Sequence, residues 1–358
     1  MEQDDPCMRG IPLESQNYFL ACYAASLIQG ESITGIAIRS RTVINYISAA
    51  CELFTEQKLP SPRLSNTDYI SVITNALKNY EQVENRRVMI TDAMTQWMYD
   101  YVQKLPPDAP ERAIFDWILL GRYGGFRPVE WCQHTQTSFR RIEEWPGQPP
   151  YGFIPSDFSF LGTSERRLTP ADLLKIDMID SIQVRFRKQK NKDNGQVIPF
   201  KRDLVNPHLC PVRAAFRILV RHKRLQGSEH EPLAICRNHT NTKTIFITDS
   251  LTTKFLRKAA IAAHNISPKS SALNQWSSHS IRVTAANLLH RAHLSDSFIQ
   301  MRLRWKSTAF LRYLRNTFYA ADSHTKAMGI SDSNLPALAA RSYRPLEPHE
   351  TLQLAPAA

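Results

Sequence analysis

The chain contains no long apolar run and no closely spaced cysteine pair. None of its 358 residues lies in a stretch approaching the ~18 consecutive apolar residues that a membrane-spanning helix needs. Its first residues, Met-Glu-Gln-Asp-Asp-Pro, are acidic and polar, unlike a secretory signal peptide. The six cysteines are scattered without a Cys-x-x-Cys pair, which argues against a zinc site or a disulfide framework. We therefore expect an intracellular protein with no membrane partner, located in the nucleus of a eukaryotic host or otherwise in the cytoplasm.

Basic residues outnumber acidic ones. Lysine and arginine total 45 against 33 aspartate and glutamate, a formal net charge of +12. A positive field of this size favours a polyanionic partner such as nucleic acid. The 42% hydrophobic content is ordinary for a globular protein and is ample for a sizeable core.

Apolar periodicity indicates a mainly helical protein with one small β-sheet, an α+β fold. Helical spacing covers most of the chain, while residues 182–187 alternate apolar and basic side chains as a half-buried strand does. An Asp-Asn-Gly turn then leads to a second short strand at 197–200. The expected organisation is a disordered N-terminus at 1–15, a helical domain at 16–84, a second domain at 85–322 and a loose tail at 323–358.

Two short motifs, far apart in the chain, carry residues suited to binding a phosphate. Gly-Gly-Phe-Arg ends at Arg127, and Glu130 lies three residues on, where it can fix the guanidinium. His279 and Arg282 lie three apart on one expected helix, which Ser277 or Ser278 would cap. Either motif alone is common by chance.

Downstream of these motifs are an aromatic donor and a tyrosine. Trp305 follows Arg282 by 23 residues, and Tyr313 follows Trp305 by 8, within a basic stretch. Two arginines can neutralise the charge that develops on a phosphodiester, an indole N–H can donate to it, and a tyrosine can attack it. No carboxylate cluster suggests a metal, so we expect no metal or cofactor.

In this order and spacing, the set resembles the tyrosine recombinases, the phage-integrase type of DNA strand-exchange enzymes. The spacing to Tyr313 is one residue short of the family pattern, and Tyr319 is a weaker substitute. Short stretches such as Arg-Leu-Arg-Trp-Lys-Ser resemble the Crypton-like branch of eukaryotic mobile elements. The resemblance implies a helical core-binding domain followed by an integrase-type catalytic domain.

The resemblance also implies functional roles. Tyr313 would attack the scissile phosphate and form a 3′-phosphotyrosyl link, while a lysine from the β-hairpin protonates the leaving oxygen. We favour Lys190, with Lys188 as runner-up. Double-stranded DNA is the expected partner, bound by a tetramer on two paired sites. Alternatives are a catalytically silent DNA-binding protein and a type IB topoisomerase. The expected catalytic residues are Arg127, Lys190, His279, Arg282, Trp305 and Tyr313, supported by Glu130. The expected DNA-binding residues are Arg185, Arg187, Lys188, Lys192, Arg39 and Arg41.

Overall fold

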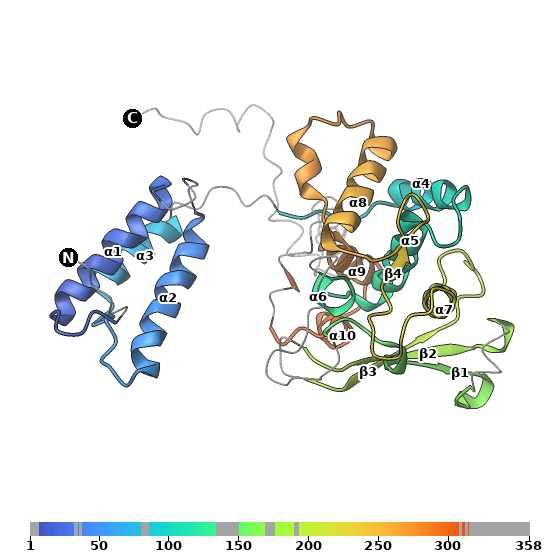
Figure 1. Cartoon of the computed structure of the whole chain (residues 1–358), viewed down its shortest axis with the longest axis horizontal. Coiled ribbons are helices and arrows are strands. Elements are labelled where there is room, and N and C mark those ends of the chain that lie inside the picture. The colour runs from blue at the N-terminus through green and yellow to red at the C-terminus, as the bar shows by residue number, and fades with distance from the viewer. Residues whose placement is uncertain are drawn as a thin grey trace, which may run out of the picture. The chain divides into compact units, whose positions relative to one another are not determined.

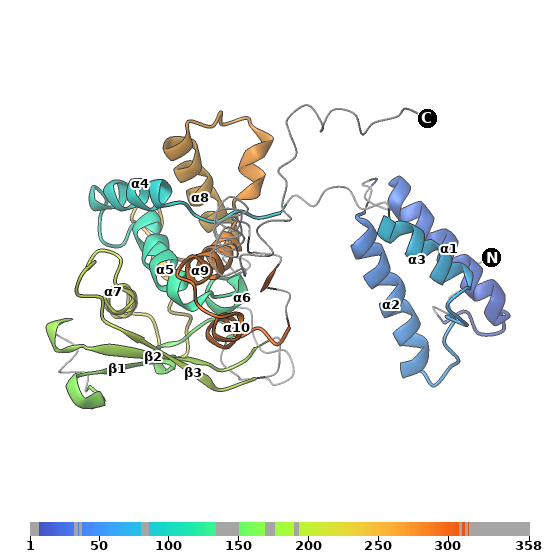
Figure 2. The ribbon, with the colours of Figure 1, turned by 180° about the vertical axis from the view of Figure 1, so that it is seen from behind.

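The computed structural model divides the chain into two units, residues 1–85 and 86–358 (Figures 1 and 2). The sequence places its domain boundary at residue 84. Each unit is described by itself below. The structure describes residues 7–31, 35, 38–79, 86–133, 150–168, 176–189, 193–307, 310, 311 and 314.

The first unit is a set of packed helices. They are α1 (Leu13–Gln29), α2 (Ser40–Glu56) and α3 (Tyr69–Asn79). Their apolar faces form one core that includes Leu27, Val43 and Ile70. Asn17 on α1 is 1% exposed and donates to the Pro62 carbonyl at 2.8 Å, so a buried amide holds the loop that leads into α3.

The second unit is built around α5 (Pro110–Gly124), whose residues are buried along most of its length. Side-chain caps begin several of its helices, because a hydroxyl satisfies an otherwise unpaired N–H. Thr91 accepts from Met94 N, and Thr248 and Ser295 cap two later helices in the same way. The remaining helices are α4 (Asp92–Gln103), α6 (Pro128–Trp131), α7 (Pro211–Arg224), α8 (Asp249–His264), α9 (Ser280–Arg291) and α10 (Asp296–Leu303).

An antiparallel sheet lies along one side of α7 in this unit (Figures 1 and 2). Its strands run in the order β1 (Phe158–Leu161), β2 (Ser181–Phe186) and β3 (Gln196–Lys201). The register pairs Ile182 with Phe200 and Val184 with Ile198, and these four side chains are buried. The last two strands confirm the expected hairpin. The fold is thus mainly helical with small antiparallel sheets, as expected.

Several short elements were not predicted from the sequence. They are β1, the two-stranded sheet of β4 (Ile235–Arg237) and β5 (Thr244–Phe246), and the 3₁₀ turns η1 (Pro155–Asp157), η2 (Thr163–Glu165), η4 (Ile176–Met178) and η5 (Ser271–Gln275). Three to five residues are too few to show a clear period. None of the helices in the described ranges is both long and apolar enough to cross a bilayer.

A close approach between α5 and α9 sets the position of the first residues of α9. A Cβ added at Gly121 on α5 would lie 2.5 Å from Ile281 Cγ2, so a larger residue would push α9 away. Because Arg282 follows Ile281, this glycine brings the guanidinium toward the turn that ends α5. The fold therefore joins two motifs that lie about 150 residues apart in sequence.

Candidate active site

The turn after α5 places Arg127 at the start of α6. Gly125 ends α5 with a left-handed φ of 55°, and a Cβ there would approach Leu303 Cδ2 to 2.7 Å. Arg127 then precedes Pro128, the first residue of α6. Its backbone N–H donates to Glu130 Oε2 at 2.8 Å and its Nη1 to Glu130 Oε1 at 2.9 Å. The expected Arg127–Glu130 contact is present, and it fixes the arginine at both backbone and side chain.

Arg282 joins three segments of the second unit. Its side chain is buried, with 1% of the residue exposed. It donates to the carbonyl of Gly125, at the turn below α5, and to the carbonyl of Leu303 at 2.8 Å. Its guanidinium carbon lies 4.1 Å from the centre of the Trp305 ring, a cation–π geometry. Trp305 and Arg282 therefore meet as the sequence pattern suggests, with the ring covering the cation.

His279 lies before the first residue of α9. The expected cap at Ser277 or Ser278 is wrong, because His279 itself occupies the cap position and α9 begins at Ser280. Burial, together with the positive charges of Arg282, Arg87 and Arg127, lowers the pKa of His279 to about 4. The imidazole is therefore neutral at pH 7.

A buried arginine that the sequence reasoning did not select completes this cluster. Arg304 follows α10 with a left-handed backbone, φ 58° and ψ 49°. It donates to the Gly124 carbonyl at 2.9 Å, to Glu130 Oε2 at 2.8 Å and to Gln189 Oε1 at 3.0 Å. Burial lowers its pKa to about 10 while Glu130 opposes the shift, so it stays cationic at pH 7.

The two arginines of Arg-Leu-Arg look alike in sequence, yet Arg302 on α10 is only half-buried while the Arg304 side chain is fully buried. Nothing in the local pattern distinguishes them. The burial of Arg304 comes from the turn after α5 and from the hairpin, which are remote in sequence.

The hairpin arginines lie in a separate set of contacts. Arg187 donates from Nε to Asp157 at 2.7 Å and from Nη2 to the carbonyls of Pro150 and Gly152, so its guanidinium holds the loop before β1. Burial raises the pKa of Asp157, and Arg187 opposes this most. The Arg185 side chain is 47% exposed, with its Nε 3.5 Å from Asp157.

The other expected residues lie apart from this cluster or outside the described residues. Lys188 Nζ lies 5.4 Å from the centre of the Tyr151 ring. Arg39 and Arg41 are exposed at the start of α2, in the first unit. Lys190, Lys192 and Tyr313 lie outside the described residues.

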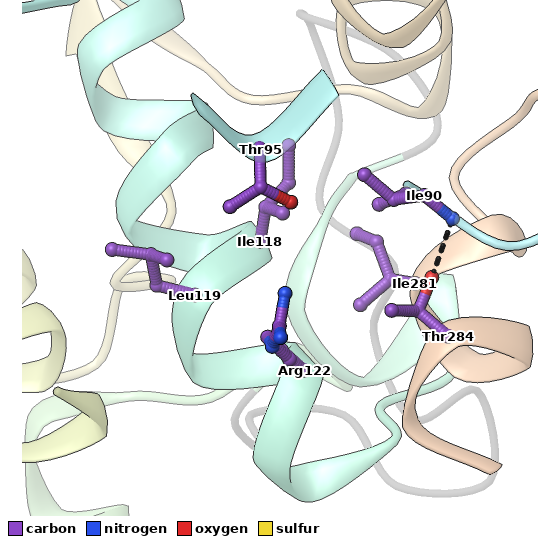
Figure 3. A pocket seen from close by; sticks show the side chains of 7 residues that line it. All are labelled: Ile90, Thr95, Ile118, Leu119, Arg122, Ile281 and Thr284. Atoms are coloured by element: carbon purple, nitrogen blue, oxygen red, sulfur yellow. Dashed lines mark hydrogen bonds between the residues drawn. The ribbon is translucent and has the colours of Figure 1, made fainter. Parts of the chain in front are cut away.

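Two cavities of the second unit lie apart from the arginine cluster. A small one of about 10 Å³, between α4, α5 and α9, is lined mostly by apolar side chains with Arg122 at one side (Figure 3). That volume holds about one water molecule. A larger one of about 370 Å³ is lined by residues that include Tyr99, Arg112 and Arg217. Neither includes Arg127, Arg282 or Arg304.

The cluster concentrates positive charge at one place. Three guanidiniums are accompanied by one buried carboxylate, Glu130, which contacts two of them. A neutral imidazole and an indole lie beside them. Such a set can neutralise a tetrahedral phosphate and can donate or accept a proton next to it.

Comparison with protein-family models gives no match, and comparison with curated proteins gives none either. Among solved structures, similar chains are integrases and recombinases. The Tn1549 transposon integrase in complex with transposon right end DNA is 12% identical, with a TM-score of 0.49 over 90% of this chain and 87% of that chain. The XerH site-specific recombinase bound to palindromic difH substrate is 14% identical, with a TM-score of 0.47 over 88% and 73%. A lambda integrase tetramer bound to a Holliday junction is 15% identical, with a TM-score of 0.38 over 86% and 74%.

Proposed function

We propose that this protein is a site-specific DNA recombinase or transposase that cleaves and rejoins strands through a 3′-phosphotyrosyl intermediate. The observation that carries the proposal is the convergence of Arg127, His279, Arg282 and Trp305 around one point. Arg282 contacts both the turn of Arg127 and the Trp305 ring, and both arginines depress the pKa of His279. A protein that only binds DNA has no need to gather these groups at a single place.

The proposed reaction assigns a role to each group. The Tyr313 oxygen forms a bond to phosphorus, and the bond from phosphorus to the 5′-oxygen breaks. Arg127 and Arg282 neutralise the non-bridging oxygens as the pentacoordinate state forms. Neutral His279 can accept or share a proton on the tyrosine side, and Trp305 can donate to a phosphate oxygen. A hairpin lysine, Lys190 or Lys188, gives a proton to the departing 5′-oxygen.

The burial of Arg282 has a consequence for DNA binding. Only 1% of the residue is exposed, and the Trp305 ring lies 4.1 Å from its guanidinium. Contact with a phosphodiester therefore requires the covering groups to move when DNA binds. Exchange between two duplexes breaks four strands, and each protomer has one nucleophile, so we propose a tetramer on two paired sites.

The test is capture of a covalent adduct. Wild-type protein is incubated with end-labelled, random-sequence duplexes that carry a nick. Cleavage close to the nick releases a short fragment, and once this fragment has diffused away the strand cannot be rejoined. The protein then stays covalently attached to the DNA. We expect an adduct that survives denaturation and is lost in Tyr313→Phe. Tyr319→Phe is the matched control and retains the adduct. An adduct that persists in Tyr313→Phe rules out this nucleophile, and salt-sensitive binding without any adduct supports the silent DNA-binding alternative.

A further inference from the structure

Basic residues at every second position from 302 to 306, at and just after the end of α10, contact the β2–β3 hairpin. Arg302 donates to the Pro199 carbonyl at 3.0 Å, and Lys306 Nζ lies 2.8 Å from Asp193 Oδ1. Between them in sequence lies Arg304, whose side chain is fully buried, whereas that of Lys306 is 59% exposed. Since exposed ion pairs contribute little, Arg304 makes the strongest of these contacts.

The hairpin partner of Arg304 is Gln189, which holds the base of the hairpin loop. Gln189 is 5% exposed. Its backbone N–H donates to Asn194 Oδ1 at 2.8 Å, and its Nε2 donates to the Asp193 carbonyl at 2.5 Å. Its remaining side-chain oxygen accepts from Arg304 Nε at 3.0 Å. Gln189 directly precedes Lys190, so whatever fixes Gln189 also fixes where the loop with that lysine begins.

The same guanidinium reaches the catalytic arginine on its other side. Arg304 Nη2 donates to Glu130 Oε2 at 2.8 Å, and Glu130 Oε1 accepts from Arg127 Nη1 at 2.9 Å. The backbone carbonyl of Arg304 also accepts from Arg127 Nη2 at 3.5 Å. The contacts therefore run from Gln189 through Arg304 and Glu130 to Arg127 without a break. Only a planar fork of several donors can make these bonds together, and lysine cannot.

The position of Arg304 is costly for the fold. A left-handed backbone is unfavourable at a residue other than glycine, and the φ of Arg304 is 58°. The fold also buries a cation there, which is unfavourable unless its partners are well placed. Strain and buried charge of this kind concentrate where a precise geometry is used.

We propose that Arg304 is a positioning residue that holds Gln189, the residue before Lys190, and Arg127 in one fixed relation to each other. The inference rests on the proposed strand cleavage. The lysine protonates the 5′-oxygen as that oxygen leaves, while Arg127 neutralises the phosphate. Both must act in one transition state, and a displacement of about 1 Å can cost on the order of 10²-fold in rate. The planar guanidinium of Arg304, hydrogen-bonded to Gln189 and to Glu130, fixes the separation of the described base of the hairpin from Arg127.

Replacing the leaving oxygen with sulfur distinguishes a defect on the hairpin side of Arg304 from a defect on the Arg127 side. The substrate is a nicked duplex of the sequence captured by the wild-type protein, with either oxygen or sulfur bridging the scissile phosphorus and the 5′-carbon. With sulfur, the bond from phosphorus to sulfur breaks and a thiolate leaves, which needs no proton because thiols are far more acidic than alcohols. Cleavage of the sulfur substrate therefore does not depend on the hairpin lysine.

We expect Gln189→Met and Arg304→Lys to behave differently on these substrates. Gln189→Met frees only the hairpin, so it slows single-turnover cleavage of the oxygen substrate by about tenfold or more, part of the ~10²–10⁴-fold that general acid catalysis contributes. It leaves cleavage of the sulfur substrate near the wild-type rate. Arg304→Lys also releases Glu130 and Arg127, so it slows both. Arg302→Lys is the matched control and keeps both rates. Equal losses for Gln189→Met on the two substrates, or none on either, overturn the proposal.

Hydrogen–deuterium exchange provides a measurement that needs no catalysis. The Gln189 amide bonds to Asn194, and the Gly195 amide bonds to the Phe186 carbonyl at 2.7 Å. We expect both amides to exchange faster in Arg304→Lys and at the wild-type rate in Arg302→Lys. Equal exchange in the two variants contradicts the link. If wild-type protein forms no adduct on any DNA, the proposed function fails, and this comparison still decides whether Arg304 holds the hairpin.

Discussion

Replacing Glu130 with glutamine should lower the free energy of unfolding of the second unit far more than a comparable substitution at the surface. Glu130 is 4% exposed and balances Arg304, whose side chain is fully buried, and Arg127, whose side chain is 19% exposed. An arginine does not lose its proton near neutral pH, so Glu130→Gln leaves a buried positive charge without its counter-ion. Breaking a buried pair in this way costs about 3–5 kcal/mol.

The same chemical change at an exposed pair provides the control. Arg202 Nη2 lies 2.7 Å from Asp177 Oδ1, but the Asp177 side chain is 80% exposed. Solvent screens this pair, and Asp177→Asn should cost less than about 1 kcal/mol. The two variants differ in burial and not in the length of the bond or in the kind of substitution.

Urea unfolding followed by tryptophan fluorescence is a suitable assay. All six tryptophans lie after residue 85, so the signal reports the second unit alone. The double variant Glu130→Gln/Arg304→Gln tests the cause, because its cost should fall below the sum of the single costs if the two charges balance each other. Equal losses for Glu130→Gln and Asp177→Asn, or strict additivity in the double variant, would refute the reasoning.

Two other expectations concern pH and DNA binding. The unfolded chain binds a proton at His279 below pH 6.5 and the folded chain only below about 4, so the free energy of unfolding should fall as pH drops through this window. The loss is at most ~3 kcal/mol, and urea titrations of His279→Gln should lack this component, whereas an unchanged pH profile would contradict it. Arg185→Ala should lower the magnitude of the negative slope of log K against log salt by about 0.9 per lost phosphate contact. Arg187→Ala should leave that slope unchanged and instead destabilise the fold, since it leaves Asp157 buried without its closest partner; a reduced slope for Arg187→Ala would show that Arg187 contacts DNA.

The elements that the sequence predicts well are those with many repeats of a period. Two such elements are α8 (Asp249–His264) and α7 (Pro211–Arg224), which lie where the chain has helical spacing. Both are amphipathic over several turns, so packing and propensity agree. The short strands β1, β4 and β5 have three or four residues each, and they form because partner strands and helices surround them, which no local pattern encodes.

The site shows the same division. Arg127 and Glu130 are predictable because their contact is local, three residues apart across one helical turn. His279, Arg282 and Trp305 are predictable only as a resemblance, since separate elements bring them together. The contact of Arg187 with Asp157 was not expected, because basic residues on a hairpin look alike in sequence whether they face solvent or a buried carboxylate.

Arg304 marks the limit of reading function from residue types. In sequence it is one basic residue among several near Trp305, and in the structure it contacts the turn below α5, the carboxylate of Glu130 and the hairpin. These contacts exist only because three segments remote in sequence meet at Arg304, so no local sequence pattern could have predicted them. A buried arginine in a left-handed conformation is nevertheless unfavourable, because a glycine would satisfy the backbone without the buried charge. The contacts that offset this cost are the same ones that tie the hairpin to Arg127, which is why the position of Arg304 points to a role in alignment.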